Sequence, residues 1–494
     1  MLLRTLALGS FCLACQLGCQ DLWSFTLQQN PNNCASLAGR CGPDSVCNSL
    51  TEICEPGLGL SSLTPPRGPT SGGTQLSISG RGFLPGTQLR MGQPGALVQP
   101  LEIASEQRLE FKLPAAPGAC GRVPIEVSRP GVESVRRDDL FSYFLSDLRF
   151  NGGQPVGTST SNFTTYLAAQ DLNGDGLADV VATAYGHAGI DVYLGSADGS
   201  LQSLPRIPTG AGPYHLAIAD VDGNGIPDIA VANSGGSTAS VLLGTGGGKF
   251  QSAVNLANSG AFTVHFFDAD SDSRLDLVVL TTSGKVRLWK GDGKGGFAFI
   301  SENDIDIDSV LALSADFDHD GRTDLVGSSK TGTALVLYRN RGDGTFQLVS
   351  SNQTAASATN CIAVDVNQDG KLDLIAAEYY AGQTSVFLGH GDGTFEPRRA
   401  YNTLPGNRVL ASADFNCDGV PDIAVSRLGA TQVLQLLGRG DGTFDIAPRL
   451  ITLAAGTSAL AVVAADVDHD GRPDLVVGVD GTTPAVYSVL NTSQ

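Results

Sequence analysis

The sequence has few basic residues, almost no Met or Trp, and no long apolar run after its first twenty positions. Its 494 residues include 31 Lys and Arg against 50 Asp and Glu, a net charge of −19. A general binder of nucleic acids or anionic membranes needs a positive surface, so both classes are excluded. Hydrophobic residues still make up 41% of the chain, which is too many for a disordered protein. We therefore expect the chain to fold.

The first apolar run is too short to be a permanent membrane span. It covers residues 6–14 after the single charge of Arg4, whereas a transmembrane helix needs about 20 apolar residues. This pattern predicts an export signal over residues 1–19. The signal ends in Leu17-Gly18-Cys19, which resembles a bacterial lipobox, although Gln16 stands where Leu is usual. Plain secretion and a surface lipoprotein, such as one of the outer membrane, both remain open, and a lipid on Cys19 would be the only membrane link.

Cysteines are concentrated in residues 20–60. The cluster consists of Cys34, Cys41, Cys47 and Cys54. Four cysteines in a short exported segment predict two disulfides, and zinc is disfavoured because the cluster has no C-x₂-C pair and no His. Three later cysteines are Cys120, Cys361 and Cys417. Their number is odd, so at least one is expected to be free, and the sequence gives no basis for pairing the others.

Residues 61–145 are rich in Pro and Gly and contain short alternating runs such as Gln75-Leu76-Ser77-Ile78-Ser79. This alternation is typical of half-buried strands. The strings Gly72-Gly73-Thr74 and Gly80-Arg81-Gly82-Phe83, with the closing Phe141-Ser142-Tyr143, resemble the IPT/TIG family of immunoglobulin-like domains. The resemblance implies a β-sandwich, for which we expect the role of a spacer because such a fold does not by itself specify a function.

Residues 146–494 contain seven copies of a nine-residue acidic loop, which begin 48 to 52 residues apart. Apolar runs too short for helices stand on both sides of each loop, and three copies share a later Gly-Asp-Gly-Thr-Phe turn. Four short strands in about 50 residues are typical of a propeller blade. We therefore predict an all-β protein: a seven-bladed β-propeller preceded by an immunoglobulin-like β-sandwich and a small disulfide-rich segment.

The last copy ends without the glycine turn and without a fourth strand. Leu148-Arg149-Phe150 stands before the first loop as Thr443-Phe444-Asp445 stands in a preceding unit. We infer that the segment 148–157 supplies the missing strand and closes the ring, which leaves only short exposed edges.

The loops carry the ligand types that calcium prefers. Oxygen-bearing side chains occupy positions 1, 3, 5 and 9, and position 7 offers its backbone carbonyl. Hard oxygen ligands in this number suit Ca²⁺, whereas softer metals need His or Cys. The predicted ligands of up to seven ions are Asp171, Asn173, Asp175, Leu177 and Asp179; Asp220, Asp222, Asn224, Ile226 and Asp228; Asp268, Asp270, Asp272, Arg274 and Asp276; Asp316, Asp318, Asp320, Arg322 and Asp324; Asp365, Asn367, Asp369, Lys371 and Asp373; Asp414, Asn416, Asp418, Val420 and Asp422; and Asp466, Asp468, Asp470, Arg472 and Asp474.

Each loop begins like an EF-hand but lacks the Glu at position 12, where Val231 and Ala376 stand in two copies. Such a loop between strands resembles the FG-GAP, VCBS-like or integrin-α propeller repeat. The alternative is a solvated Asx turn, which seven copies in register disfavour. The loops hold 24 of the 50 acidic residues, and crowded carboxylates repel one another unless a cation neutralises them. Ser273 replaces the usual Gly of position 6 in the third loop, so we expect that loop to bind most weakly.

No catalytic motif is present: the sequence has no G-x-S-x-G, H-E-x-x-H or P-loop, and its six His are scattered. We predict that the protein is not an enzyme. The function predicted is an exported, calcium-binding surface protein whose propeller presents a face to an extracellular protein or glycan. The resemblance to integrin heads implies that this face lies opposite or beside the calcium loops. A carbohydrate-binding or lyase-type polysaccharide-processing protein is the alternative.

Overall fold

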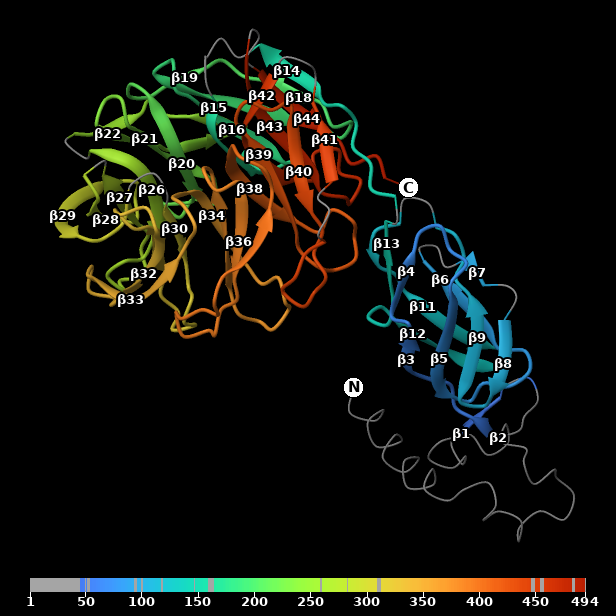
Figure 1. Ribbon diagram of the computed structural model, residues 1–494. Helices are drawn as coiled ribbons and strands as arrows, with labels where there is room; N and C mark the ends of the chain where they lie inside the picture. Colours follow the sequence, from blue (N-terminus) through green and yellow to red (C-terminus); the bar gives the residue numbers. More distant parts are fainter. Residues whose placement is uncertain are drawn as a thin grey trace, which may run out of the picture. The chain divides into compact units, whose positions relative to one another are not determined.

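The computed structural model describes residues 45–48, 50, 54–92, 96–98, 101–116, 119–145, 147–158, 164–257, 260–281, 283–308, 312–445, 449–453, 457–481 and 485–493. The predicted export signal, with Cys19, and the clustered Cys34 and Cys41 lie outside these residues. The described residues form only strands and their connections (Figure 1). Within them, no helix has the length and hydropathy needed to cross a membrane.

The chain divides into two compact units. The first comprises Met1–Asp147 with Asn416–Gly419 and Ser493–Gln494, and the second comprises Leu148–Phe415 with Val420–Thr492.

The first unit contains two four-stranded antiparallel sheets and two smaller ones. One large sheet has the order β3 (Gly59–Thr64), β5 (Gln75–Arg81), β9 (Arg108–Lys112), β8 (Leu101–Ser105), and the other β12 (Val132–Arg137), β11 (Ile125–Arg129), β6 (Gln88–Met91), β7 (Ala96–Leu97). The smaller sheets are β10 (Gly121–Arg122), β13 (Ser142–Phe144), β4 (Arg67–Pro69), and the hairpin β1 (Ser45–Cys47) with β2 (Cys54–Pro56).

Alternation along β5 builds the core of this unit, as the sequence predicts. Leu76 and Ile78 are buried, whereas Gln75 and Ser79 are exposed. The two buried side chains belong to one cluster with Phe111 from β9 and residues of β11. The sandwich therefore forms because the inward positions of both large sheets are apolar.

The later cysteines pair in a way that their spacing does not indicate. Cys120 and Cys417 form a disulfide across 297 residues, and both belong to the first unit. Cys361 is free and buried, which agrees with the expectation of at least one free thiol. Of the N-terminal cluster, Cys54 is disulfide-bonded.

The second unit consists of seven sheets with four strands in series, together with two short additions, among the described residues. In spatial order the first three are β15 (Thr164–Gln170), β16 (Asp179–Ala184), β17 (Gly189–Gly195), β18 (Leu201–Ser203); β20 (Pro213–Ala219), β21 (Asp228–Asn233), β22 (Thr238–Leu242), β25 (Val254–Leu256); and β26 (Ala261–Phe267), β27 (Asp276–Thr281), β28 (Lys285–Gly291), β29 (Phe297–Asp304). The additions are β19 (Ile207–Pro208), which pairs with β17, and the hairpin β23 (Gly244–Gly246) with β24 (Lys249–Phe250).

The other four sheets repeat the same order. They are β30 (Ala312–Ala315), β31 (Asp324–Ser328), β32 (Ala334–Asn340), β33 (Phe346–Gln353); β34 (Ala358–Val364), β35 (Asp373–Glu378), β36 (Gln383–Phe387), β37 (Arg399–Asn402); β38 (Asn407–Ala413), β39 (Asp422–Arg427), β40 (Gln432–Leu436), β41 (Arg449–Thr452); and β42 (Thr457–Ala465), β43 (Asp474–Gly481), β44 (Ala485–Val489), β14 (Gln154–Thr158). Second strands such as β21 and β35 are buried along their whole length because neighbouring sheets cover both faces.

The predicted ring closure is confirmed. Strand β14, which precedes the first loop, pairs with β44 of the last sheet, with Gln154 opposite Ser488. Phe150 forms a bridge with Asn491, as Phe444 does with Gly438 within an earlier blade. Val156 of β14 is buried in a cluster with residues of β15, β16 and β43. The N-terminal strand therefore packs between the last blade and the first.

The seven first strands form an inner ring. Neighbours in the order β15, β20, β26 and β30, β34, β38, β42, β15 contact one another. His265 of β26 contacts Ser314 of β30 (Nδ1 to Oγ, 3.2 Å) and completes the ring. Each acidic loop follows the end of a first strand, so the loops lie at one end of the ring and the starts of these strands lie at the other.

Candidate metal centres and a central cavity

The aspartate at position 9 is the anchor of each loop. In the second loop, Asp228 is fully buried and accepts two backbone hydrogen bonds, from Val221 (2.8 Å to Oδ2) and from Gly244, which lies just after the third strand β22 (2.7 Å to Oδ1). Both bonds recur in the other six loops, at Asp179, Asp276, Asp324, Asp373, Asp422 and Asp474. This carboxylate therefore connects three strands of a blade whether or not a metal is bound.

The aspartate at position 1 shapes the turn. Asp220 accepts hydrogen bonds from Gly223 (2.8 Å to Oδ1) and Gly225 (2.7 Å to Oδ2). Positions 4 and 6 have positive φ in all seven loops. Glycine at position 6 is expected because it adopts this conformation without strain. Position 4 is a feature that the sequence analysis missed, since five copies use another residue there: Ser271, His319, Gln368, Cys417 and His469.

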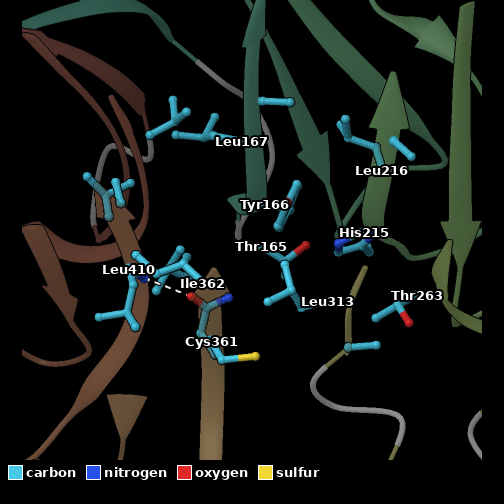
Figure 2. Close-up of a pocket in the computed structure, with 18 of the residues that line it drawn as sticks. Thr165, Tyr166, Leu167, His215, Leu216, Thr263, Leu313, Cys361, Ile362 and Leu410 are labelled. Carbon is cyan, nitrogen blue, oxygen red and sulfur yellow. Dashed lines mark hydrogen bonds between the residues drawn. The ribbon is translucent and has the colours of Figure 1, made fainter. Parts of the chain in front are cut away.

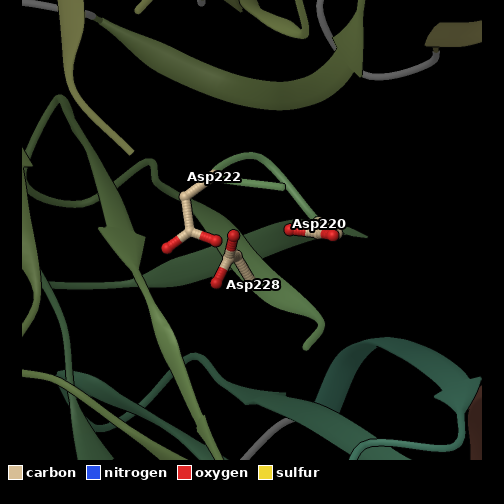
Figure 3. A group of neighbouring side chains, drawn as sticks. All are labelled: Asp220, Asp222 and Asp228. Atoms are coloured by element: carbon tan, nitrogen blue, oxygen red, sulfur yellow. The ribbon is translucent and has the colours of Figure 1, made fainter. Parts of the chain in front are cut away.

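Four loops bring three carboxylates to one point. Their ligand atoms lie within 4.8 Å of one another, and Figure 3 shows this arrangement for the second loop. The groups are Asp220, Asp222 and Asp228; Asp268, Asp270 and Asp276; Asp316, Asp318 and Asp320; and Asp466, Asp468 and Asp474. Oδ1 of Asp270 and of Asp316 is buried without a hydrogen-bond partner. Convergent oxygens with unused lone pairs fit a hard cation such as Ca²⁺.

Burial and the crowding of carboxylates raise the pKa of two aspartates at position 9. Burial, with a smaller contribution from Asp468 and Asp470, raises the pKa of Asp474 to about 7. Burial, together with Asp318 and Asp320, raises the pKa of Asp324 to about 6. A bound cation opposes both effects, because it replaces lost hydration and screens the repulsion between carboxylates.

Basic side chains lie against the carboxylates of the third loop, and the fourth loop has a comparable contact, between Arg339 of β32 and Asp318. Ser273 has a φ of 66°, and its amide donates to Asp268 (2.7 Å), as the glycine of the second loop does to Asp220. Lys290, from β28, contacts the carboxylates of both Asp270 and Asp272. Its ammonium group would therefore compete with a metal ion for these two carboxylates. The sequence analysis missed this contact because Lys290 lies on another strand.

The other three loops differ from these four at position 3. Loops one, five and six have Asn at position 3, and the described residues show no three-carboxylate group there. The sixth loop is divided between the two units, with Asn416 and Asp418 in the first. The role of the position 7 carbonyl stays a prediction.

A cavity of about 790 Å³ lies inside the ring of first strands and is shown in Figure 2. Its lining includes Tyr166, His215 and Cys361, which come from β15, β20 and β34. Burial lowers the pKa of His265 to about 4 and also lowers that of His215, so both imidazoles are neutral near pH 7. Burial raises the pKa of Cys361 to about 12, which keeps its thiol protonated.

Comparisons with solved structures give similarity in fold at low identity. A lectin of Agrocybe aegerita, whose structure concerns recognition of non-reducing terminal N-acetylglucosamine, is 19% identical, with 68% of this chain and 91% of that chain covered and a TM-score of 0.45. BBS1N, solved in complex with ARL6DN, is 13% identical, with 71% and 97% covered and a TM-score of 0.49. A putative 6-phosphogluconolactonase of Bacteroides uniformis is 12% identical, with 74% and 98% covered and a TM-score of 0.45.

A comparison with curated protein sequences finds no match. Family models match both parts of the chain. The IPT/TIG domain matches residues 59–143. The FG-GAP-like repeat matches residues 171–231, 220–279, 268–326, 316–376, 365–425 and 428–477, which together include all seven acidic loops. The repeats cover more than half of the chain and have the strand order, ring closure and carboxylate loops described above, so the protein belongs to the FG-GAP-like repeat family.

Proposed function

We propose that this is an exported protein whose propeller is stabilised by calcium and presents a recognition face to an extracellular protein or glycan. The observation that carries the calcium part is the convergence of three carboxylates within 4.8 Å in four of the seven loops. The apolar run over residues 6–14 and the disulfide between Cys120 and Cys417 support export, because disulfides persist mainly in oxidising compartments.

Calcium in this arrangement would act as a structural ion. The ligands of a loop lie within nine residues, and the strands on both sides belong to one blade, so an ion would tighten a hairpin without bridging parts that move. Extracellular sites bind calcium with a Kd of roughly 10⁻⁴ to 10⁻³ M. At about 1 mM calcium and a Kd of about 0.1 mM, one site contributes about 1.4 kcal/mol, so seven could contribute about 10 kcal/mol.

A thermal melt tests this proposal directly. The protein in millimolar calcium should melt many degrees above the protein in EDTA, and magnesium should restore little of the difference because it demands a tighter octahedral shell. Superimposable melting curves would refute the calcium assignment. A glycan array and a protein-binding screen, both in calcium, would test the recognition face.

A lyase-type polysaccharide-processing enzyme is the second candidate. The observation that favours it is the presence of neutral His215 and His265 with Tyr166 in one cavity, since imidazole and phenol groups serve as general acids and bases. Incubation with polyuronates should then release unsaturated sugar ends. Intact polymer after incubation would exclude this activity for these substrates.

A further inference from the structure

The first strands pair irregularly with the second strands near their starts. These starts lie at the end of the ring away from the acidic loops. The register between first and second strands shifts near Tyr166, Tyr214, Phe262 and Arg408. Similar shifts occur in β34 and β42. A β-bulge turns side chains out of the regular alternation, and such bulges are common beside binding sites. Three of these four residues, Tyr166, Tyr214 and Arg408, line the cavity.

The charge of the cavity is unusual for so acidic a protein. Among the described residues, its lining contains no Asp, Glu or Lys, and Arg408 is the one charged residue. Arg408 is half-buried, and among the described residues no carboxylate forms an ion pair with its guanidinium. Burial raises the pKa of Tyr214, and the positive charge of Arg408 opposes this effect. A cation would find no carboxylate to pair with among these residues, whereas a ligand with one carboxylate would pair with Arg408.

Uncharged polar groups without hydrogen-bond partners lie in the wall of the cavity. Thr263 and His265 are 2% and 8% exposed, and Oγ1 of Thr263 and Nε2 of His265 have no hydrogen-bond partner. His215 accepts a hydrogen bond at Nδ1 from the amide of Val264 (3.5 Å), so its neutral ring carries the proton on Nε2. Buried polar groups of this kind are normally satisfied, by water or by a ligand.

Aromatic rings gather at the same end of the ring. Tyr214 lies against Phe262 with ring centroids 4.2 Å apart, and Tyr185 lies 6.4 Å from Tyr214. Tyr380, which also lines the cavity, is 79% exposed. The face of an aromatic ring is negative and apolar, so it attracts the C–H bonds on one face of a sugar ring. An exposed aromatic at a cavity mouth is also a common feature of ligand sites.

We propose that this cavity binds an acidic sugar residue, a uronate at the end of a glycan chain, with its carboxylate on Arg408 and its ring on the aromatic side chains. The inference rests on the proposed recognition function and names its ligand class. A volume of about 790 Å³ is within the range of small-molecule sites. Polyphosphates fit poorly, because a single guanidinium would leave most of their charge unpaired in a buried site.

The test is titration calorimetry of the full chain in calcium, with trimers of galacturonate and of glucuronate as probes. At least one trimer should bind, and its methyl ester should bind at least tenfold more weakly because esterification removes the charge that Arg408 recognises. Arg408→Gln should weaken binding of the free acid at least tenfold and leave the ester unchanged. Arg449→Gln, at an exposed position on β41, is the matched control and should bind like the unaltered protein.

Three outcomes of the uronate titrations would overturn the inference. These are no binding of either trimer at millimolar concentration, equal binding of acid and ester, and equal effects of the two arginine substitutions. Tighter binding of an acetylated tripeptide with a free carboxylate would also overturn it, in favour of a peptide end as the ligand. The calcium melt separates these failures from failure of the proposed function, because calcium-dependent stability with no uronate binding refutes the uronate site alone. Melting of Arg408→Gln at the temperature of the unaltered protein would show that it folds.

Discussion

Position 9 of the acidic loops should serve two purposes, and one pair of substitutions in the second loop can separate them. Asp228 is fully buried, and its carboxylate accepts hydrogen bonds from Val221 and Gly244. Asp222, at position 3, is half-buried and accepts a hydrogen bond from the backbone amide of Asn224 (3.1 Å). Asp228→Ala should therefore destabilise the propeller with or without calcium, whereas Asp222→Ala should matter mainly when calcium is present.

The magnitudes follow from these contacts. Asp228→Ala leaves two buried amides without acceptors, at a cost of about 1–3 kcal/mol each, or about 2–6 kcal/mol in total. At about 2 °C per kcal/mol for a domain of this size, the melting temperature in EDTA should fall by about 4–12 °C. Asp222→Ala should change it little in EDTA and remove about 1.4 kcal/mol in about 1 mM calcium, where the site is lost.

The assay is a set of melts of the unaltered protein and both variants, each in EDTA and in calcium. The reasoning is refuted if Asp228→Ala melts in EDTA at the same temperature as Asp222→Ala, since the two hydrogen bonds would then contribute nothing measurable. It also fails if Asp222→Ala loses as much stability in EDTA as in calcium, since position 3 would then have a structural role that its contacts do not indicate.

Three further predictions concern the third loop, the closing strand and the cavity. Lys290→Met should raise the calcium affinity of the third loop by about 0.5–1 kcal/mol, roughly two- to five-fold, because it removes a competing cation; calorimetry would show it, and Lys294→Met should have no such effect. Val156→Asp should cost about 3 kcal/mol or more because it buries a charge in the seam of the ring, whereas the exposed Gln154→Asp on the same strand should melt almost normally. The pKa of His265 is about 4 against an ordinary 6.5, so the unfolded chain takes up a proton first as pH falls. Stability should therefore decrease between about pH 6.5 and 4 by roughly 3 kcal/mol, and His265→Gln should remove that part of the decrease in melts across this range.

Much of the propeller could be predicted from local sequence. The ligands of each loop lie within nine residues, and the hydrogen bonds of Asp220 to Gly223 and Gly225 close inside the same turn. Such a unit has its shape wherever it occurs, so seven copies reveal the blade and its period. The missing fourth strand of the last copy also indicated ring closure, which β14 and β44 confirm.

Contacts between distant segments could not be predicted in this way. Cys120 pairs with Cys417 across 297 residues, and no spacing rule relates them. The weakening effect of Ser273 on the third loop stays a prediction, whereas the local sequence gave no sign of Lys290, which lies on another strand and contacts the carboxylates of Asp270 and Asp272.

The sequence by itself determined the repeat, the carboxylate loops and the closing strand, because each depends on residues close together along the chain or on a count of equivalent units. The tertiary structure decides which cysteines pair, which loops contact a basic side chain from another strand, and which side chains share the cavity. Tyr166, His215 and Arg408 meet there because the ring brings the starts of β15, β20 and β38 together, and that closeness is a property of the closed ring and of no single repeat.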